Sequence, residues 1–263
     1  MEEITSLDNP KVKLAFRLQD RRDRDKQGLF LIEGYRELLR AIEGKQPLDY
    51  LFVCPELFLG SNEDQLIASA RTRVYQVPEK VFRKLSYRDR PDGLLAVAPQ
   101  RHLGLKDLPK TENRFLLVAE AIEKPGNLGT LLRSSDAAGI DACILADKTT
   151  DLHNPNVVRA SVGTLFTLPV IEAGAEETLA YLKKNKIKIV SATPHAALSY
   201  TESDLTGDIA IVVGTEQLGL SKLWMEQADI QVRIPMKGKA DSLNVATAAT
   251  LLLFEALRQR DMK

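Results

Sequence analysis

Three short loops in the second half of the chain hold residues suited to binding a ligand. Each is rich in glycine or proline and mixes apolar with small polar side chains: Pro125–Gly129, Gly214–Ser221 and Ile234–Asn244. Glycine lets the backbone approach a ligand closely, and free N–H and C=O groups at such turns can bind an adenine edge or an amino-acid moiety. Each loop alone also fits an ordinary strand–helix connection. Three together predict a pocket for a small molecule.

The first loop lies between a predicted strand and a predicted helix. An apolar run before it indicates a buried strand, and Pro125 turns the chain. From Leu128 the apolar spacing becomes helical. This arrangement predicts Asn127 at a helix start and Arg133 about one and a half turns into that helix. In open α/β sheets, ligands bind at the edge of the sheet where the strands end and such loops begin.

Predicted strands and helices alternate along the chain, which indicates an α/β fold. The polar stretch Pro99–Asn113 lacks periodicity and holds two prolines, so we interpret it as a linker. We therefore expect two domains, residues 1–107 and 113–263. In the second domain the strand-to-helix alternation continues to a long final helix, Leu243–Gln259, whose apolar face is expected to be core or dimer interface.

Near the N-terminus, Lys11–Lys26 is predicted to form one helix with a strongly charged end. Its cations could contact phosphates, and the interleaved acids fit a solvent-exposed face equally well. These cations are Lys11, Lys13, Arg17, Arg21, Arg22 and Arg24.

Composition excludes several classes of protein. The chain has 263 residues and a formal net charge of zero, which argues neither for nor against nucleic acid. No apolar run reaches the roughly 18 residues of a membrane span, and the start lacks a signal-peptide core, so we expect a cytoplasmic protein without a membrane partner. Cys54 and Cys143 lie in apolar runs and are expected to be buried free thiols.

Common catalytic templates do not occur. The sequence has no GxxxxGK[ST], HExxH or GxSxG motif, and the turn at Gly126 lacks the GxGxxG of a Rossmann cofactor site. The histidines His102, His153 and His195 lack ligand spacing and are expected to be surface or loop residues. We therefore expect no metal site.

The loops resemble known signature motifs. PGNLGTLLRSSDAAG, VVGTEQLGLS and IPMKGKADSLNVATAATLLLFEALRQR are similar, in order and spacing, to the three motifs of the SpoU/TrmH branch of the SPOUT RNA methyltransferases. HNPNVVRASVGTLFTLPV resembles the segment between the first two motifs. In the front half, SLDNPKVK and FLIEGYRELL resemble the ribosomal-protein-like substrate-binding domain that often precedes this catalytic domain.

This resemblance implies a fold, a cofactor and a reaction. It implies a C-terminal SPOUT domain with a parallel sheet and a deep trefoil knot, behind a small α/β RNA-binding domain. The implied enzyme is a homodimer that binds S-adenosylmethionine and methylates a ribose 2′-hydroxyl in structured RNA, most plausibly ribosomal RNA. Transfer RNA, or a non-catalytic RNA-binding ribosome-assembly role, is the alternative.

The resemblance also implies roles for individual residues. Arg133 matches the proposed activator of the 2′-hydroxyl, and the other catalytic positions are Asn127, Glu216 and Asn244. The cofactor-binding positions are Gly214, Ile234, Ser242 and Leu243. Arg159 and Ser161 match a segment near the site, and with Lys11 and Arg21 they are the expected substrate contacts.

Two of these polar positions have simpler interpretations. Ser242 is suited to cap the last helix, which would place Asn244 inside the first turn, where stability does not need an amide. We therefore expect a functional role for Asn244 more than for Ser242. Glu216 is suited either to orient Arg133 or Asn127 or to cap a short helix after Ser221, and the motif favours the site.

Overall fold

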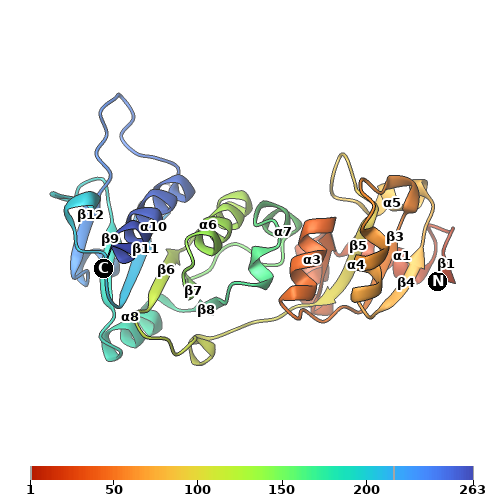
Figure 1. Cartoon of the computed structure of the whole chain (residues 1–263), viewed down its shortest axis with the longest axis horizontal. Coiled ribbons are helices and arrows are strands. Elements are labelled where there is room, and N and C mark those ends of the chain that lie inside the picture. The colour runs from red at the N-terminus through yellow and green to blue at the C-terminus, as the bar shows by residue number, and fades with distance from the viewer. Residues whose placement is uncertain (1, 216, 263) are drawn as a thin grey trace. The chain divides into compact units, whose positions relative to one another are not determined.

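The computed structural model describes residues 2–215 and 217–262, which fold into two compact units (Figure 1). The first unit comprises Met1–Arg101 and Asp151–Thr167, and the second comprises His102–Thr150 and Leu168–Lys263. Each has its own sheet and its own buried apolar clusters. The α/β class predicted from the alternation is confirmed.

The sheet of the first unit is mixed. Its strand order is β1-β4-β3-β5-β2; β4 runs parallel to β1 and β3, and β5 runs antiparallel to both of its neighbours. Side chains alternate between the two faces, so each face has a separate apolar cluster. The strands are β1 (Glu2–Glu3), β2 (Leu29–Glu33), β3 (Tyr50–Val53), β4 (Arg73–Gln76) and β5 (Leu94–Pro99).

Helices cover both faces of this sheet. Residues of α1 and α5 belong to one apolar cluster, and residues of α3, α4 and α7 belong to the other. The bounds are α1 (Pro10–Arg17), α2 (Arg21–Gln27), α3 (Tyr35–Glu43), α4 (Glu63–Ser69), α5 (Glu79–Leu85) and α7 (Pro155–Ala160), with short 3-10 turns at η1 (Pro55–Leu57) and η3 (Thr164–Phe166).

The prediction of one helix over Lys11–Lys26 is wrong. The first helix ends at Arg17, and Asp20 adopts an extended backbone and accepts a hydrogen bond from the N–H of Arg22 at 2.8 Å. An aspartate at this position is a strong N-cap, so it begins a second helix.

The segment Asp151–Thr167 folds with the first unit, although it lies far along the sequence. Val158 of α7 joins the apolar cluster of that unit. The Arg24 guanidinium, 1% exposed, contacts the Asp151 carboxylate at 2.6 Å and donates to two backbone carbonyls. A buried charge needs such partners. The expected boundary at residues 107–113 assigned this segment to the second domain, and the compact units differ from it here.

The second unit contains a seven-stranded sheet in which all paired strands are parallel. This confirms the predicted parallel sheet. Its order is β10-β12-β9-β11-β6-β7-β8. The strands are β6 (Phe115–Glu120), β7 (Ala142–Ala146), β8 (Val170–Ala173), β9 (Lys188–Ala192), β10 (Leu198–Ser199), β11 (Ile209–Val213) and β12 (Ile230–Arg233). Their apolar runs fit a sheet that is covered on both faces.

Helices α6 and α10 pack against each other on one side of this sheet, and α8 lies on the other side (Figure 1). Helix α6 begins at Pro125, three residues before the apolar spacing becomes helical, because proline suits the first helical position. The helices are α6 (Pro125–Ala137), α8 (Ala175–Lys184), α9 (Lys222–Glu226) and α10 (Val245–Asp261), with 3-10 turns η2 (Leu105–Asp107) and η4 (Tyr200–Glu202). Among the described residues, no helix is long and apolar enough to cross a bilayer.

Candidate functional site

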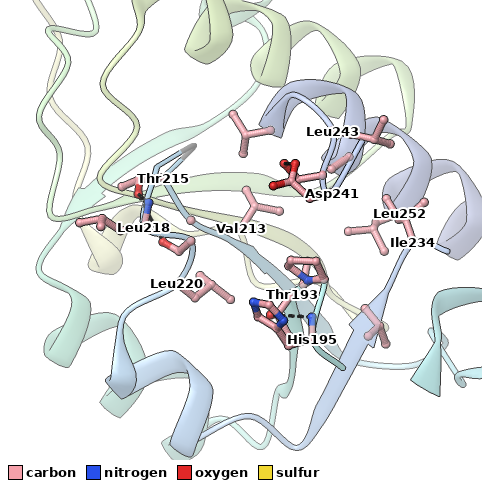
Figure 2. Close-up of a pocket in the computed structure, with 18 of the residues that line it drawn as sticks. Thr193, His195, Val213, Thr215, Leu218, Leu220, Ile234, Asp241, Leu243 and Leu252 are labelled. Carbon is pink, nitrogen blue, oxygen red and sulfur yellow. Dashed lines mark hydrogen bonds between the residues drawn. The ribbon is translucent and has the colours of Figure 1, made fainter. Parts of the chain in front are cut away.

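A cavity of about 500 Å³ lies at the carboxyl ends of β9, β11 and β12 in the second unit (Figure 2). Loops that follow these three strands line it, and the start of α10 closes one side. Carboxyl ends of parallel strands meet at one edge of the sheet, which is where open α/β folds bind ligands. The four predicted cofactor-binding residues, Gly214, Ile234, Ser242 and Leu243, all line this cavity.

The loop after β11 is a tight turn. The backbones of Thr215 and Gly219 exchange two hydrogen bonds of 3.0 Å, which brings Gly219 against Gly214. A Cβ atom built on Gly214 would lie 2.2 Å from the Gly219 carbonyl oxygen, so only glycine fits there. The buried Glu120 carboxylate at the end of β6 accepts the N–H of Ser221 at 2.9 Å and fixes the end of the loop. Glu216, a predicted catalytic residue, lies outside the described residues.

Asn244, and not Ser242, caps the last helix. Its side-chain oxygen accepts from the N–H groups of Ala246 and Thr247 at 3.0 and 3.4 Å, and α10 begins at the next residue. The expectation that Ser242 caps this helix, with Asn244 inside the first turn, is therefore wrong. The Asn244 amide also donates to the side-chain oxygen of Asn127 on α6 at 3.1 Å. One side chain thus caps α10 and joins it to α6.

Arg133 lies on the exposed side of α6, in the same helix as Asn127. It does not line the cavity, and its guanidinium makes no hydrogen bond or ion pair with the residues that the structure describes. The two helices are held together nearby, where the Thr250 hydroxyl of α10 lies 2.7 Å from the Ser134 hydroxyl. The guanidinium is therefore available to a ligand on a helix that packing and hydrogen bonds hold in place.

The four predicted substrate contacts all belong to the first unit. Arg159 is exposed. Ser161 is fully buried, and its hydroxyl donates to the Val158 carbonyl at 2.9 Å, so it stabilises the local backbone and is not accessible to a substrate. Lys11 lies over two aromatic rings, and Arg21 contacts an acid one turn later at 3.6 Å.

The sequence patterns missed several cavity residues. Figure 2 shows Thr193, His195 and Asp241 among the side chains around the cavity, and the backbone N–H of His195 donates to the Thr193 hydroxyl at 3.3 Å. Their position directly after a strand or next to a motif residue was the available signal. Among the described residues that line the cavity, Asp241 is the one acidic side chain.

The remaining histidines and the cysteines lie elsewhere. His153 is 3% exposed, and its ring lies 4.6 Å from that of Phe30; of the two expected placements, surface or loop, it has the loop but not the surface. Cys54 and Cys143 are buried free thiols, as predicted, and burial raises the pKa of both to about 12. No group of three potential metal ligands occurs within residues 2–215 and 217–262.

Comparisons with known proteins match both halves of the chain. The model of the SpoU rRNA Methylase family matches residues 114–254, and that of the MRM3-like substrate binding domain matches residues 9–96. The 23S rRNA (guanosine(2553)-2′-O)-methyltransferase RlmP of Bacillus subtilis (strain 168) is 30% identical over 97% of this chain and 98% of its own length.

Two solved structures share the fold over nearly the whole chain. A crystal structure of an RNA 2′-O ribose methyltransferase has 45% identity and a TM-score of 0.87, with 98% of each chain covered. An AdoMet-bound rRNA methyltransferase from Sinorhizobium meliloti has 31% identity and a TM-score of 0.88, with 98% of this chain and 97% of that chain covered. The resemblance in the three loop motifs is confirmed, and the chain belongs to the SpoU rRNA methylase family.

Proposed function

We propose that the protein is an S-adenosylmethionine-dependent methyltransferase that modifies a ribose 2′-hydroxyl of ribosomal RNA. The observation that carries the proposal is the meeting of the loops after β11 and β12 around one cavity in a member of this family. The relative from Bacillus subtilis is named as a 2′-O-methyltransferase of 23S rRNA, and the structure from Sinorhizobium meliloti contains AdoMet.

The cavity fits S-adenosylmethionine in size and chemistry. Its volume of about 500 Å³ lies within the range of roughly 300–1,000 Å³ that is typical of ligand sites. Leu220, Ile234 and Leu252 supply apolar surface for an adenine ring, and the close turn at Gly214 exposes backbone groups to its edge. The Asp241 carboxylate complements a positively charged ligand. When bound, the cofactor supplies a methyl group on a reactive sulfonium.

Arg133 is proposed as the main catalytic side chain. A ribose hydroxyl is a poor nucleophile, so holding it in line with the methyl group is a large part of catalysis. As the hydroxyl oxygen loses its proton, negative charge grows on it, and a fixed guanidinium stabilises that charge. Arginine keeps its proton because its pKa is above about 12, so the side chain acts as a clamp for a phosphate and for the developing alkoxide, and the proton passes to phosphate or water.

The polar pair on α6 and α10 is proposed to position the reacting groups. The hydrogen bond between Asn127 and Asn244 fixes both amides at the N-terminal ends of the two helices. Helix N-termini favour negative charge, and the pair is therefore suited to hold the ribose or its phosphate beside Arg133. Glu216 is proposed to orient these groups through its carboxylate.

We extend the proposal to the deep trefoil knot that the family resemblance implies. Support comes from the strand order, in which β11 is inserted between β9 and β6, and from α10, which returns to pack on α6 and β11. Pulling the unfolded chain from its two ends tests this. A knot shortens the extended chain, whereas an end-to-end length of about 3.3–3.6 Å per residue would show that no knot exists.

A homodimer is proposed through the exposed side of α10. Leu251 and Phe254 are 39% and 44% exposed, whereas Leu252 is 1% exposed and belongs to the core. Apolar residues exposed together on one helix face are suited to a partner surface, here a second copy of the chain. Sedimentation should show a dimer for the wild type and a monomer for Phe254→Asp, and a monomeric wild type would contradict the dimer.

Calorimetry combined with methyl transfer tests the proposed function. The folded protein should bind S-adenosylmethionine and S-adenosylhomocysteine, and it should transfer tritiated methyl groups to ribosomal RNA from a strain that lacks the gene. Transfer RNA from the same strain is the comparison substrate, and label in transfer RNA alone would change the substrate class. Absence of both heat and label would overturn the function.

A further inference from the structure

Arginine side chains gather around a groove of about 820 Å³ in the first unit. Four segments line this groove: the start of α3, the loop before α4, the loop after α5, and the segment that carries α7. We call it the arginine groove, after Arg36, Arg88, Arg90 and Arg159, which line it. It is separate from the cavity already described, because none of its lining residues belongs to the second unit.

Three of the four carboxylates in the arginine groove already have partners inside the protein. Glu63 accepts two backbone N–H groups of its own loop at 2.7 and 3.2 Å, and Asp92 accepts the N–H at the start of α3 at 2.8 Å. Glu37 contacts the Arg88 guanidinium at 2.6 Å. All three carboxylates are buried, and burial raises the pKa of Glu37 despite that contact. These three carboxylates are therefore less accessible to a ligand in the groove than the exposed side chains are.

The cations of the arginine groove are less engaged. Arg36 and Arg90 are exposed, and their guanidinium groups make no ion pair or hydrogen bond with the described residues. Arg159 is also exposed and donates only to a neutral amide, the Asn156 side chain, at 3.1 Å. Against these three guanidinium groups stands one exposed carboxylate among the described lining residues, Asp89. The groove is neutral in composition, with four arginines and four carboxylates, but three guanidinium groups and one carboxylate are the charged groups that it exposes to solvent.

This charge pattern suits a phosphate ligand. Guanidinium groups bind phosphate oxygens through paired hydrogen bonds, and contacts with several successive phosphates dominate RNA affinity. Leu59, 82% exposed, adds apolar surface at the rim of the groove. The first unit also contains the stretch that matches a substrate binding domain.

We propose that the arginine groove binds the phosphodiester backbone of the RNA substrate through Arg36, Arg90 and Arg159. The inference rests on the proposed function and deepens it, since it assigns substrate contacts to named side chains. Arg159 falls inside the stretch that matches the methylase family, residues 114–254, yet it folds with the first unit. The RNA site is therefore built from both halves of the sequence.

The test is RNA binding by the full chain carrying Arg36→Gln, Arg90→Gln and Arg159→Gln. Ribosomal RNA from a strain that lacks the gene is the probe, and affinity is measured between about 50 and 200 mM salt. Loss of three phosphate contacts should weaken binding roughly tenfold or more and reduce the slope of log affinity against log salt by about 2–3. Because all three side chains are exposed, thermal unfolding should be unchanged.

Two matched variants sharpen this test. Arg83→Gln removes an exposed arginine on α5 that is paired with Glu79 at 2.6 Å, and it should change RNA affinity by less than about twofold. Replacing the three groove arginines by lysine keeps the charge but not the paired hydrogen bonds. This variant should recover most of the salt slope and only part of the affinity.

Calorimetry with S-adenosylmethionine on the same preparations separates the two proposals. If the wild type neither binds the cofactor nor methylates RNA, the proposed function fails. If the wild type does both, and the glutamine variant binds RNA with wild-type affinity and salt slope, the arginine groove is not the RNA site. The second result would leave an acidic protein surface as the alternative occupant.

Discussion

The cavity of the second unit and the arginine groove of the first unit differ in the side chains that line them. Backbone groups and apolar side chains such as Leu220, Ile234 and Leu252 line much of the cavity, and Asp241 is its acidic group among the described residues. Exposed guanidinium groups dominate the groove, whose carboxylates mostly point inward. The first can hold a small cationic cofactor by shape, and the second can hold a polyanion by charge.

This difference assigns the two kinds of specificity to different units. Shape and backbone hydrogen bonds discriminate among small molecules, whereas guanidinium contacts with phosphates fix the position of RNA without reading its bases. Under the proposed function, the chemistry depends on a few side chains of the second unit that belong to neither surface, above all Arg133.

Arg133→Ala should produce the largest change and should leave both binding surfaces intact. If Arg133 stabilises charge on the ribose oxygen as proposed, its removal should lower kcat by roughly 10²–10³-fold. The affinity for S-adenosylmethionine should be unchanged, because Arg133 does not line the cavity. Single-turnover methylation and calorimetry measure the two quantities. Arg133→Lys is the control, since it keeps a positive charge, and full turnover of the alanine variant would remove the proposed mechanism.

Added salt should weaken RNA binding much more than cofactor binding. Three phosphate contacts in the arginine groove predict a roughly 20- to 40-fold loss of RNA affinity between about 50 and 200 mM salt. Cofactor affinity should change by less than about twofold, because shape and apolar contacts are insensitive to screening. Parallel titrations in one buffer series measure this. If the affinities for RNA and cofactor fell equally with salt, the two surfaces would not differ in the way they bind their ligands.

Asp241→Asn tests the acidic group in the otherwise largely apolar cavity. S-adenosylmethionine carries a sulfonium charge that S-adenosylhomocysteine lacks, and an exposed charge pair is worth about 0.2–1 kcal/mol. The substitution should therefore weaken binding of S-adenosylmethionine by roughly 1.4- to fivefold, and binding of S-adenosylhomocysteine by less. Competition calorimetry measures the dissociation constants of both ligands. Asp64→Asn, an exposed acid on α4 of the first unit, is the control. An equal loss for both ligands would mean that Asp241 does not sense the sulfonium.

Local patterns predicted two of the loops that line the cavity, Gly214–Ser221 and Ile234–Asn244; the third predicted loop, Pro125–Gly129, does not line it, and the loop after β9 was missed. Gly214, Ile234 and Leu243 meet there because each belongs to a loop that follows a strand or opens a helix at one edge of a parallel sheet. The arginine groove was not predictable in the same way. Its charge depends on which carboxylates turn inward, and Arg159 belongs to a segment whose Asp151 pairs with Arg24, 127 positions earlier in the chain. Contacts between residues so far apart in the sequence cannot be predicted from local residue spacing.

Helix ends illustrate a second limit of the sequence. Ser242 and Asn244 are both strong capping residues, two positions apart, so propensity alone does not choose between them. The choice is made by the contact with Asn127 on another helix. Similarly, Asp20 can lie inside a charged helix or begin a new one, and the extended backbone at that residue decides it.

Effects of this same small size are expected at Asn244, where capping and catalysis can be separated. Asn244→Ala removes the cap of α10 and should lower the free energy of unfolding by about 1 kcal/mol, measured by denaturant titration. Asn244→Ser keeps a capping oxygen and should lie within about 0.5 kcal/mol of the wild type, yet it also loses the amide that donates to Asn127. If that amide positions the substrate, turnover should fall several-fold in both variants. A fully active serine variant would show that the residue only caps the helix, and the catalytic role would then rest on Arg133 without it.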